Sequence, residues 1–274
     1  MLLLPLLLLA ADPSLQALAA PAGGVVGFAA LDLASGRTLG LRENDAFPTQ
    51  SVFKLPIAIE VLRQVDAKKV SLDRVVTLDA SDARQGVADV VAVPGRATIR
   101  QLLEAMVIHS DNVSCDKLLA LIGGPGAVDA RMRALGISGI HIRFTELEMG
   151  AGKGDNTATP AAMVALLAKL ARGRLGLSRA ATKRLDQLLL DVATGPKRIK
   201  GNLPAGTPVA HKTGTSRTRD GKTDATNDAG LITLPNGHRI AVVVFVSASA
   251  ADEATREQTI ANLARAAYDR FSVK

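Results

Sequence analysis

The feature that most limits the fold is a pair of apolar segments near the C-terminus, joined by a very short turn. Residues 228–234 and 240–246 flank Pro235-Asn236-Gly237, a sequence typical of a tight hairpin turn. The second segment is apolar without alternation, as expected of a strand that is buried on both faces. So short a turn leaves no room for a crossover helix, and we therefore expect a mixed or antiparallel sheet.

The rest of the chain predicts how this sheet is completed. Further strands are expected at 24–32 and at 208–211, in opposite parts of the chain. Between them apolar residues recur at intervals of three and four, which is typical of helices. The expected helices are 98–109, 113–122, 127–135, 159–172 and 178–191, with two more at 13–20 and 253–271. The pattern therefore predicts an α/β fold, more closely an α+β fold of two subdomains. One is a sheet domain flanked by helices (21–47 and 195–274), and the other is an inserted all-helical domain (48–194).

The amino-acid composition excludes several classes of protein. The 274 residues are 47% hydrophobic and 22% charged, which favours a globular protein and excludes a disordered one. The net charge of +7 could attract an anionic partner, but the basic residues are scattered along the chain. Aromatic residues are 3% of the chain and Trp is absent, so single-stranded nucleic acid would find no stacking platform. We expect no nucleic-acid partner.

The cysteine and histidine positions argue against a metal or a disulfide. Cys115 is the only cysteine, so an intrachain disulfide and a cysteine-based zinc site are excluded. The four histidines have no paired spacing of the kind that metal sites use. They are His109, His141, His211 and His238. We expect no metal site.

The N-terminus carries an apolar run at residues 1–11 that is too short to span a bilayer. Its length suits the core of a signal peptide, and small residues that a peptidase could accept follow it. No basic residue precedes the leucines, which leaves a late start or a buried N-terminal helix as alternatives. We expect residues 1–20 to be a signal peptide, without a membrane span, and the protein to be periplasmic or secreted.

Ser51 and Lys54 form the first candidate motif, Ser-x-x-Lys. At this spacing both side chains project from one face of a helix, and a lysine beside a serine can take its proton. The motif alone is weak, because about one copy is expected by chance in a chain of this length. A second copy, Ser114 to Lys117, is interpreted as a pair on a helix surface.

Ser110-Asp111-Asn112 is the second candidate and directly follows the helix expected at 98–109. These residue types are typical of a helix end and the N-cap of the next helix. The functional alternative is a loop that places a hydroxyl and a carboxamide opposite Ser51.

Lys212-Thr213-Gly214-Thr215 is the third candidate, on the strand before the hairpin. It is either an ordinary strand end with a turn glycine or an edge strand that presents an ammonium, hydroxyls and N–H groups to a substrate. Gly214 would let a ligand approach the backbone closely.

Together and in this order, the three motifs are far more specific than any one of them. They form the signature of class A β-lactamases and penicillin-binding proteins, and the chain resembles that superfamily from about residue 13 to its end. Glu146 stands where class A β-lactamases carry a deacylation glutamate on an Ω-shaped loop, which penicillin-binding proteins lack. The Thr-Glu-x-Glu-Met form of the loop resembles a divergent class A branch. Leu147 replaces a common proline, Gly150 an asparagine that helps hold the hydrolytic water, and Asn156 stands near the place of an aspartate that pins the loop.

The resemblance implies catalytic roles for Ser51, Lys54, Ser110 and Glu146. Ser51 would attack the lactam carbonyl, with Lys54, or Glu146 through a water, as the base. The oxyanion would lie between the N–H groups of Ser51 and Thr215, and Ser110 would pass a proton to the departing nitrogen. Glu146 would then activate the water that hydrolyses the acyl-enzyme.

The resemblance also implies a substrate-binding set, which comprises Asn112, Lys212, Thr213, Gly214 and Thr215. Many relatives add an arginine for the substrate carboxylate. Ala229 stands at the matching strand position, which leaves Arg217 and Arg256 as candidates.

The implied protein is a monomeric serine β-lactamase that confers antibiotic resistance, acts on a small-molecule β-lactam and needs no cofactor. The alternatives are a D,D-peptidase that acts on cell-wall peptides and a β-lactam sensor domain that is acylated without turnover. A glutaminase on a related fold is a weaker alternative.

Overall fold

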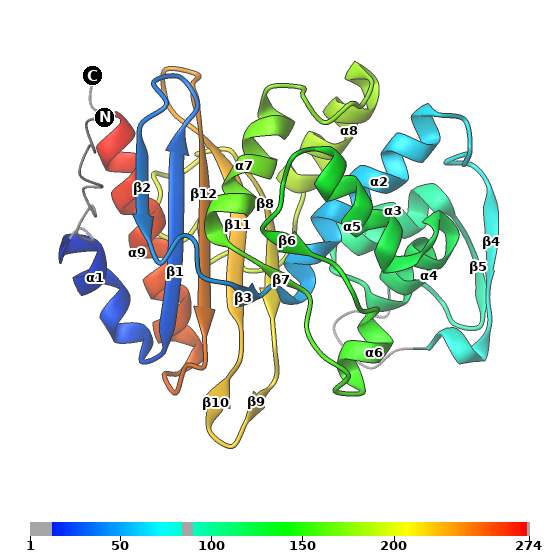
Figure 1. Cartoon of the computed structure of the whole chain (residues 1–274), viewed down its shortest axis with the longest axis horizontal. Coiled ribbons are helices and arrows are strands. Elements are labelled where there is room, and N and C mark those ends of the chain that lie inside the picture. The colour runs from blue at the N-terminus through cyan, green and yellow to red at the C-terminus, as the bar shows by residue number, and fades with distance from the viewer. Residues whose placement is uncertain (1–12, 84–89, 273–274) are drawn as a thin grey trace, which may run out of the picture.

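The computed structural model describes residues 13–83 and 90–272, and its elements are labelled in Figure 1. The helices are α1 (Pro13–Ala19), α2 (Lys54–Asp66), α3 (Ile99–Ile108), α4 (Asn112–Ile122), α5 (Gly124–Ala134), α6 (Glu146–Gly150), α7 (Pro160–Ala171), α8 (Arg179–Leu190) and α9 (Glu253–Ser272), with 3₁₀ turns η1 (Ala20–Ala22), η2 (Gln50–Phe53) and η3 (Ala80–Asp82). The strands are β1 (Val25–Asp32), β2 (Thr38–Leu41), β3 (Phe47–Pro48), β4 (Val75–Leu78), β5 (Gly95–Thr98), β6 (Ile140–His141), β7 (Thr157–Ala158), β8 (Val209–Thr215), β9 (Thr218–Arg219), β10 (Lys222–Thr223), β11 (Thr226–Thr233) and β12 (Arg239–Ser247).

Five strands form the main sheet in the order β2-β1-β12-β11-β8. Every neighbouring pair in it is antiparallel, and β1 pairs with β12 although the two lie in opposite parts of the chain. The predicted antiparallel sheet and its C-terminal hairpin, β11 to β12, are therefore confirmed. The strand that carries Lys212, β8, lies at the edge of the sheet, as one interpretation of that motif required.

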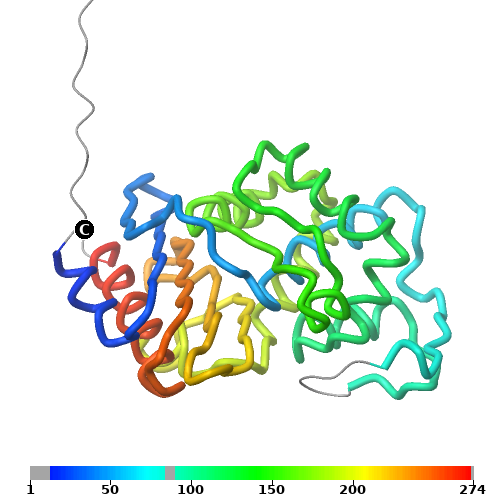
Figure 2. The backbone as a smooth tube through the Cα atoms, turned by 60° about the horizontal axis from the view of Figure 1, so that its bottom comes forward, coloured from blue at the N-terminus to red at the C-terminus, as the bar shows by residue number. Residues whose placement is uncertain are grey.

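Helices cover both faces of the sheet. In Figure 2, α1 and α9 lie on one side of it, and α7 lies on the other. Strand β12 shows the consequence for the core. Val242 and Val244 belong to the core shared with α9, whereas Val243 and Phe245 belong to the core on the α7 side. The prediction that this strand is buried on both faces is confirmed.

The remaining helices pack together on the far side of α7, on the right of Figure 1. Helix α2 lies at the centre of this helical half, with every residue from Lys54 to Leu62 buried. It contacts α3, α4, α5 and α8. The predicted limits of the two subdomains, 21–47 with 195–274 and 48–194, stay a prediction.

Helix α1 falls within the segment predicted as a leader. Residues 1–12 of that segment lie outside the described residues, whereas Leu15 and Ala19 are buried in the core shared with α9. A leader that ended at residue 20 would carry α1 away and open this core. Among the described residues, no helix is long and apolar enough to cross a membrane.

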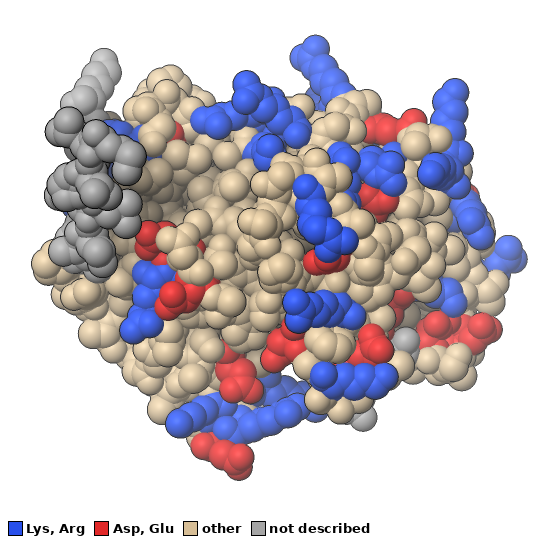
Figure 3. Space-filling model, in the orientation of Figure 1, with Lys and Arg blue, Asp and Glu red and all other residues tan. Residues whose placement is uncertain are grey.

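Charged side chains are distributed over the surface rather than gathered in one patch on the face that Figure 3 shows. Lysine and arginine alternate there with aspartate and glutamate. This agrees with the scatter of basic residues along the sequence.

Candidate active site

Ser51 lies half-buried in η2, the turn that leads into the central helix α2. The backbone before it is held from two directions. The Asn227 side chain of β11 donates to the carbonyl oxygens of Pro48 (2.8 Å) and Thr49 (3.1 Å). Thr49 in turn donates its N–H (2.9 Å) and its hydroxyl (3.0 Å) to the carbonyl oxygen of Asn156. The serine is thus fixed between the sheet and the loop that carries Glu146.

The Lys54 ammonium is the centre of the site. It is fully buried, and it donates to Ser51 Oγ at 3.1 Å and to Asn112 Oδ1 at 2.6 Å. It also donates to the Ser110 carbonyl oxygen at 2.6 Å and forms an ion pair with Glu146 Oε1 at 2.8 Å. The structure therefore brings together all four residues predicted as catalytic, together with the predicted substrate-binding Asn112.

Ser51 and Glu146 share a contact with the Lys54 ammonium, which keeps them near the distance that one bridging water molecule can span. Ser51 Oγ and Glu146 Oε1 contact the same Lys54 nitrogen, at 3.1 and 2.8 Å, which limits their separation to those two distances placed end to end. A bridging water with two ordinary hydrogen bonds spans about 5.5 Å. This geometry permits a carboxylate to activate a water against an ester at Ser51.

Ser110 connects the two buried lysines. It lies between α3 and α4 with a positive φ of 65°, and its Oγ accepts from Lys212 Nζ at 3.0 Å and from Lys54 Nζ at 3.4 Å. The capping interpretation of this motif also holds, because the Asp111 side chain accepts from the Ser114 N–H at 2.6 Å and begins α4. One tripeptide thus starts a helix and places a hydroxyl in the site.

Lys212 is buried, and no carboxylate of the described residues is in contact with it. Its ammonium donates to Ser110 Oγ and to the Thr213 carbonyl oxygen, at 3.1 Å. Burial, and next the positive charge of Lys54, lower the pKa of Lys212 from 10.5 to about 7, while the more distant carboxylates of Asp228 and Glu146 oppose this shift. An anionic ligand at this place would restore the missing counter-charge.

Gly214 is required for the close approach of β8 to the turn that carries the serine. A Cβ at this position would lie 2.4 Å from the Thr49 carbonyl oxygen and 3.1 Å from the Ser51 nitrogen. The space that the sequence analysis assigned to a ligand is therefore filled by the protein's own backbone. This approach brings the N–H groups of Ser51 and Thr215 into one region, where an oxyanion could bind.

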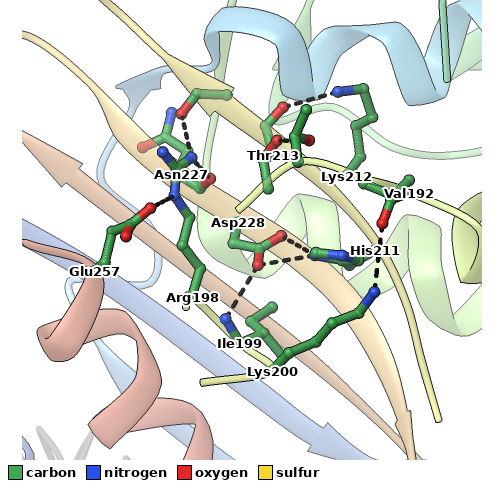
Figure 4. Close-up of polar contacts among 12 residues, drawn as sticks. Val192, Arg198, Ile199, Lys200, His211, Lys212, Thr213, Asn227, Asp228 and Glu257 are labelled. Carbon is green, nitrogen blue, oxygen red and sulfur yellow. Dashed lines mark hydrogen bonds and ion pairs between the residues drawn. The ribbon is translucent and has the colours of Figure 1, made fainter. Parts of the chain in front are cut away.

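An arginine that sequence reasoning missed reaches the edge strand. Arg198 donates to Thr215 Oγ1 (2.8 Å) and to the Gly214 carbonyl oxygen (3.2 Å). Figure 4 shows its guanidinium beside Asn227 and Glu257. The two candidates from the sequence do not take this place: Arg217 is exposed, and Arg256 donates to Thr226 Oγ1 at 2.8 Å. Nothing in the spacing of Arg198 signals its position, because a turn brings it to β8.

The loop that carries Glu146 is anchored by two buried side chains. Asn156 accepts from the N–H groups of Arg143 (2.7 Å) and Phe144 (3.0 Å), so it pins the loop in the place where relatives use an aspartate. Asp116 accepts from the N–H groups of Glu146 (2.7 Å) and Leu147 (3.0 Å).

Asp116 belongs to the second Ser-x-x-Lys copy, and the interpretation of that copy as a surface pair is wrong. Ser114 is fully buried, because α4 lies in contact with α2, α3 and α6. Only Lys117 reaches the surface, where it pairs with Asp82 at 2.8 Å. Gly150, at the end of α6, is exposed with open space around it.

No group of three or more histidine, cysteine, aspartate or glutamate side chains within the described ranges 13–83 and 90–272 could hold a metal ion. The site is built instead from two serine hydroxyls, two ammonium groups, a carboxylate and an edge strand. Such a set can form and hydrolyse an ester at Ser51.

The chain was compared with protein families and with known proteins. Residues 10–271 match the model of the β-lactamase enzyme family. The extended-spectrum β-lactamase PER-1 of Pseudomonas aeruginosa is 39% identical over 242 residues, covering 84% of this chain and 77% of that protein. The β-lactamase VEB-1 of the same species is 35% identical over 242 residues, covering 85% and 81%.

Solved structures that are similar to this chain are also β-lactamases. A β-lactamase from Chitinophaga pinensis has a TM-score of 0.91 at 40% identity, covering 94% of this chain and 98% of the other. The TLA-3 extended-spectrum β-lactamase also has a TM-score of 0.91, at 33% identity, covering 95% and 98%. A class A β-lactamase from Bacteroides cellulosilyticus has a TM-score of 0.88 at 29% identity, covering 96% and 97%. The chain belongs to the β-lactamase enzyme family, and its predicted resemblance to the class A members and to their fold is confirmed.

Proposed function

We propose that this protein is a serine β-lactamase that opens the lactam ring of penicillin- and cephalosporin-type antibiotics through an acyl-enzyme and so confers resistance. The observation that carries the proposal is the single ammonium of Lys54, which contacts both Ser51 Oγ and Glu146 Oε1. The nucleophile and the group that would activate water therefore share one network. The names of the relatives, PER-1 and VEB-1, support the same activity.

Acylation begins with attack of Ser51 Oγ on the lactam carbonyl carbon. The serine proton passes through a water to Glu146, or to Lys54 once Lys54 has given its own proton to Glu146. The N–H groups of Ser51 and Thr215 stabilise the oxyanion, and loss of one such donor typically costs about 100- to 1000-fold in rate. The carbon–nitrogen bond then breaks, and Ser110 passes a proton to the departing nitrogen. Its hydrogen bond from Lys212 supports this role.

Substrate binding rests on the carboxylate that β-lactams carry. Lys212, Thr213 and Thr215 bind it from β8 by charge-assisted hydrogen bonds, and Arg198 adds a second positive charge beside Thr215. Asn112 holds the acylamino side chain. The reaction needs no cofactor.

Deacylation is the step that distinguishes a β-lactamase from a D,D-peptidase and from a sensor domain. Glu146 activates a water that hydrolyses the ester at Ser51, a step for which D,D-peptidases of this superfamily have no equivalent residue. A sensor domain would likewise keep its acyl group. The place of Glu146, held by Asp116 and in contact with the same ammonium as Ser51, favours turnover even though Gly150 offers the hydrolytic water no side chain.

Turnover of a chromogenic cephalosporin by the wild type and by Glu146→Gln tests the proposal. We expect repeated turnover by the wild type and a trapped Ser51 adduct in the variant, detected by intact mass. Ser51→Ala is the matched control and forms no adduct. A single burst equal to the enzyme concentration in the wild type would instead support a sensor or a peptidase.

We also propose that the protein is exported to the periplasm or secreted, and that it acts as a monomer. The apolar run at residues 1–11 supports export. Because Leu15 and Ala19 are buried, cleavage before Pro13 is more compatible with the fold than cleavage after residue 20.

A further inference from the structure

A buried histidine–aspartate pair lies behind the edge strand, on the face opposite Lys212. His211 Nδ1 lies 2.9 Å from Asp228 Oδ1 and 3.0 Å from Oδ2, and both side chains are fully buried. Gly230, paired with His211 across β8 and β11, makes room for the imidazole, because a Cβ there would lie 2.7 Å from His211 Cβ. Figure 4 shows the two side chains pointing toward one another.

The aspartate makes a third contact, with a residue outside the sheet. Asp228 Oδ2 accepts from the backbone N–H of Ile199 at 3.1 Å. Ile199 follows Arg198 in a tight turn, in which the Arg198 N–H donates to the Gly195 carbonyl oxygen at 3.0 Å. The carboxylate therefore holds the backbone immediately next to the arginine that reaches the edge strand.

The hydrogen bonds indicate how the pair is protonated. His211 Nε2 is buried and accepts or donates no hydrogen bond within the part of the chain that the structure describes. A proton on that nitrogen would be a buried donor without an acceptor, which is costly. We therefore assign the proton to Nδ1, so that Asp228 accepts from both His211 and Ile199.

The guanidinium of Arg198 is fixed from its other side by α9. Its Nε forms an ion pair with Glu257 at 3.1 Å, and its Nη1 donates to the Asn227 carbonyl oxygen at 3.0 Å. These contacts leave Nη2 aimed at Thr215 Oγ1. The direction of the guanidinium thus depends on Glu257 and the strand carbonyl oxygens at the side chain, and on Asp228 at the backbone of the next residue.

We propose that His211 and Asp228 are positioning residues, which hold the turn at 195–201 so that Arg198 stays against Thr215, where the substrate carboxylate binds. The pair does not touch the substrate and acts through the arginine, while Asp228 also adds a more distant negative charge that favours the ammonium of Lys212. This inference rests on the proposed β-lactamase function.

A double-mutant cycle of Asp228→Ala and Arg198→Ala tests this. We expect Asp228→Ala to raise KM for a penicillin by about 10-fold, the size of one lost charge-assisted hydrogen bond, with a much smaller change in kcat. Measured well below pH 7, where Lys212 keeps its charge, the double variant should have the KM of Arg198→Ala alone. Asp228→Asn keeps an oxygen that can accept from Ile199 and should restore most of the affinity.

Asp186→Ala is the matched control. Asp186 pairs with Arg239 at 2.8 Å away from the site, so its loss should leave KM unchanged. Should Asp228→Ala fail to fold, the same cycle with His211→Gln replaces it. The proposal would be overturned if the increase in KM of the double variant equalled the product of the increases in the two single variants. A crystal structure of the Asp228 or His211 variant with Arg198 still on Thr215 would also overturn it. Absence of turnover in the wild type would count against the β-lactamase function instead.

Discussion

At the scale of single residues, the site is organised by two buried ammonium groups that meet at one hydroxyl. Ser110 Oγ lies 3.0 Å from Lys212 Nζ and 3.4 Å from Lys54 Nζ. Glu146 lies in contact with Lys54 and balances its charge, whereas the contacts of Lys212 among the described residues are to Ser110 Oγ and the Thr213 carbonyl oxygen. The site is therefore short of one negative charge, which the carboxylate of a β-lactam would supply.

The lowered pKa of Lys212 predicts a specific pH dependence. Because this pKa is about 7, the ammonium loses its proton as the pH rises above 7 in the free enzyme, and carboxylate binding weakens. We expect kcat/KM to fall through this range, mainly because KM rises. Lys212→Arg, which stays charged, should have lower activity, but its kcat/KM should fall less as the pH rises above 7. A wild-type profile that is level from pH 6 to 9 would contradict the prediction.

The same shift has a consequence for stability. The folded-state pKa of Lys212 lies below its unfolded value of 10.5, so the unfolded chain binds the proton more tightly. Burial of Lys212 therefore costs stability in full below pH 7, and this cost disappears as the pH rises toward 10.5. Its contribution to the free energy of unfolding should thus increase across that window.

Residues of this site differ in how far the sequence could reveal them. Ser51, Lys54, Ser110 and Lys212 stand in motifs whose order carries the information. Arg198 stands in no motif, because a turn brings it to β8 only after the sheet and α9 have formed. Its role depends on tertiary contacts that one sequence does not encode locally.

At the scale of elements, helices were easier to predict than strands. Thr98, Thr159 and Ser178 each accept a backbone N–H at the start of a helix, and such N-caps mark helix limits in the sequence. Strands β3, β6, β7, β9 and β10 have only two residues each, too few to show a period of two, and were missed. Helix α6 was also missed, although Thr145 and Glu148 form a capping box around it.

The anchoring of α6 by Asp116 predicts a selective loss of deacylation. Asp116→Ala removes the acceptor of the Glu146 and Leu147 N–H groups and lets the carboxylate move relative to the water that it activates. We expect kcat to fall by about 10- to 100-fold while acylation changes much less, since each lost hydrogen bond to a charged group is worth about 1.5–3 kcal/mol. The measurement is the acyl-enzyme fraction at steady state by mass spectrometry.

Lys117→Ala is the control for Asp116→Ala, because Lys117 lies on the same helix but pairs with Asp82 rather than with the backbone of α6. It should change neither step. Equal losses of acylation and deacylation in Asp116→Ala would show that the aspartate supports the whole site rather than the loop.

At the scale of the whole molecule, the two ends of the described chain build one side of the sheet together. Strand β1 pairs with β12, and α1 packs on α9. The helical half is formed by the chain between them. Strand β1 therefore finds its partner β12 only when the C-terminal part of the chain is present. The site lies where the edge strand β8 meets the helical half, which explains why its residues come from widely separated segments.

This arrangement predicts where a leader can be removed. Leu15 is 3% exposed and packs in the core beneath α9, and truncation of a buried leucine to alanine typically costs about 2–5 kcal/mol. A chain that starts at Pro13 should therefore unfold at the same temperature as the mature exported protein, whereas a chain that starts at Gly23 should unfold at a much lower one. Leu15→Ala separates loss of the core contact from loss of the whole helix and should fall between the two. N-terminal sequencing of the exported protein should find cleavage before Pro13, because a mature chain without α1 would leave the apolar face of α9 open to water. A mature protein that begins at residue 21 and unfolds no earlier than the Pro13 form would refute the assignment of α1 to the folded domain.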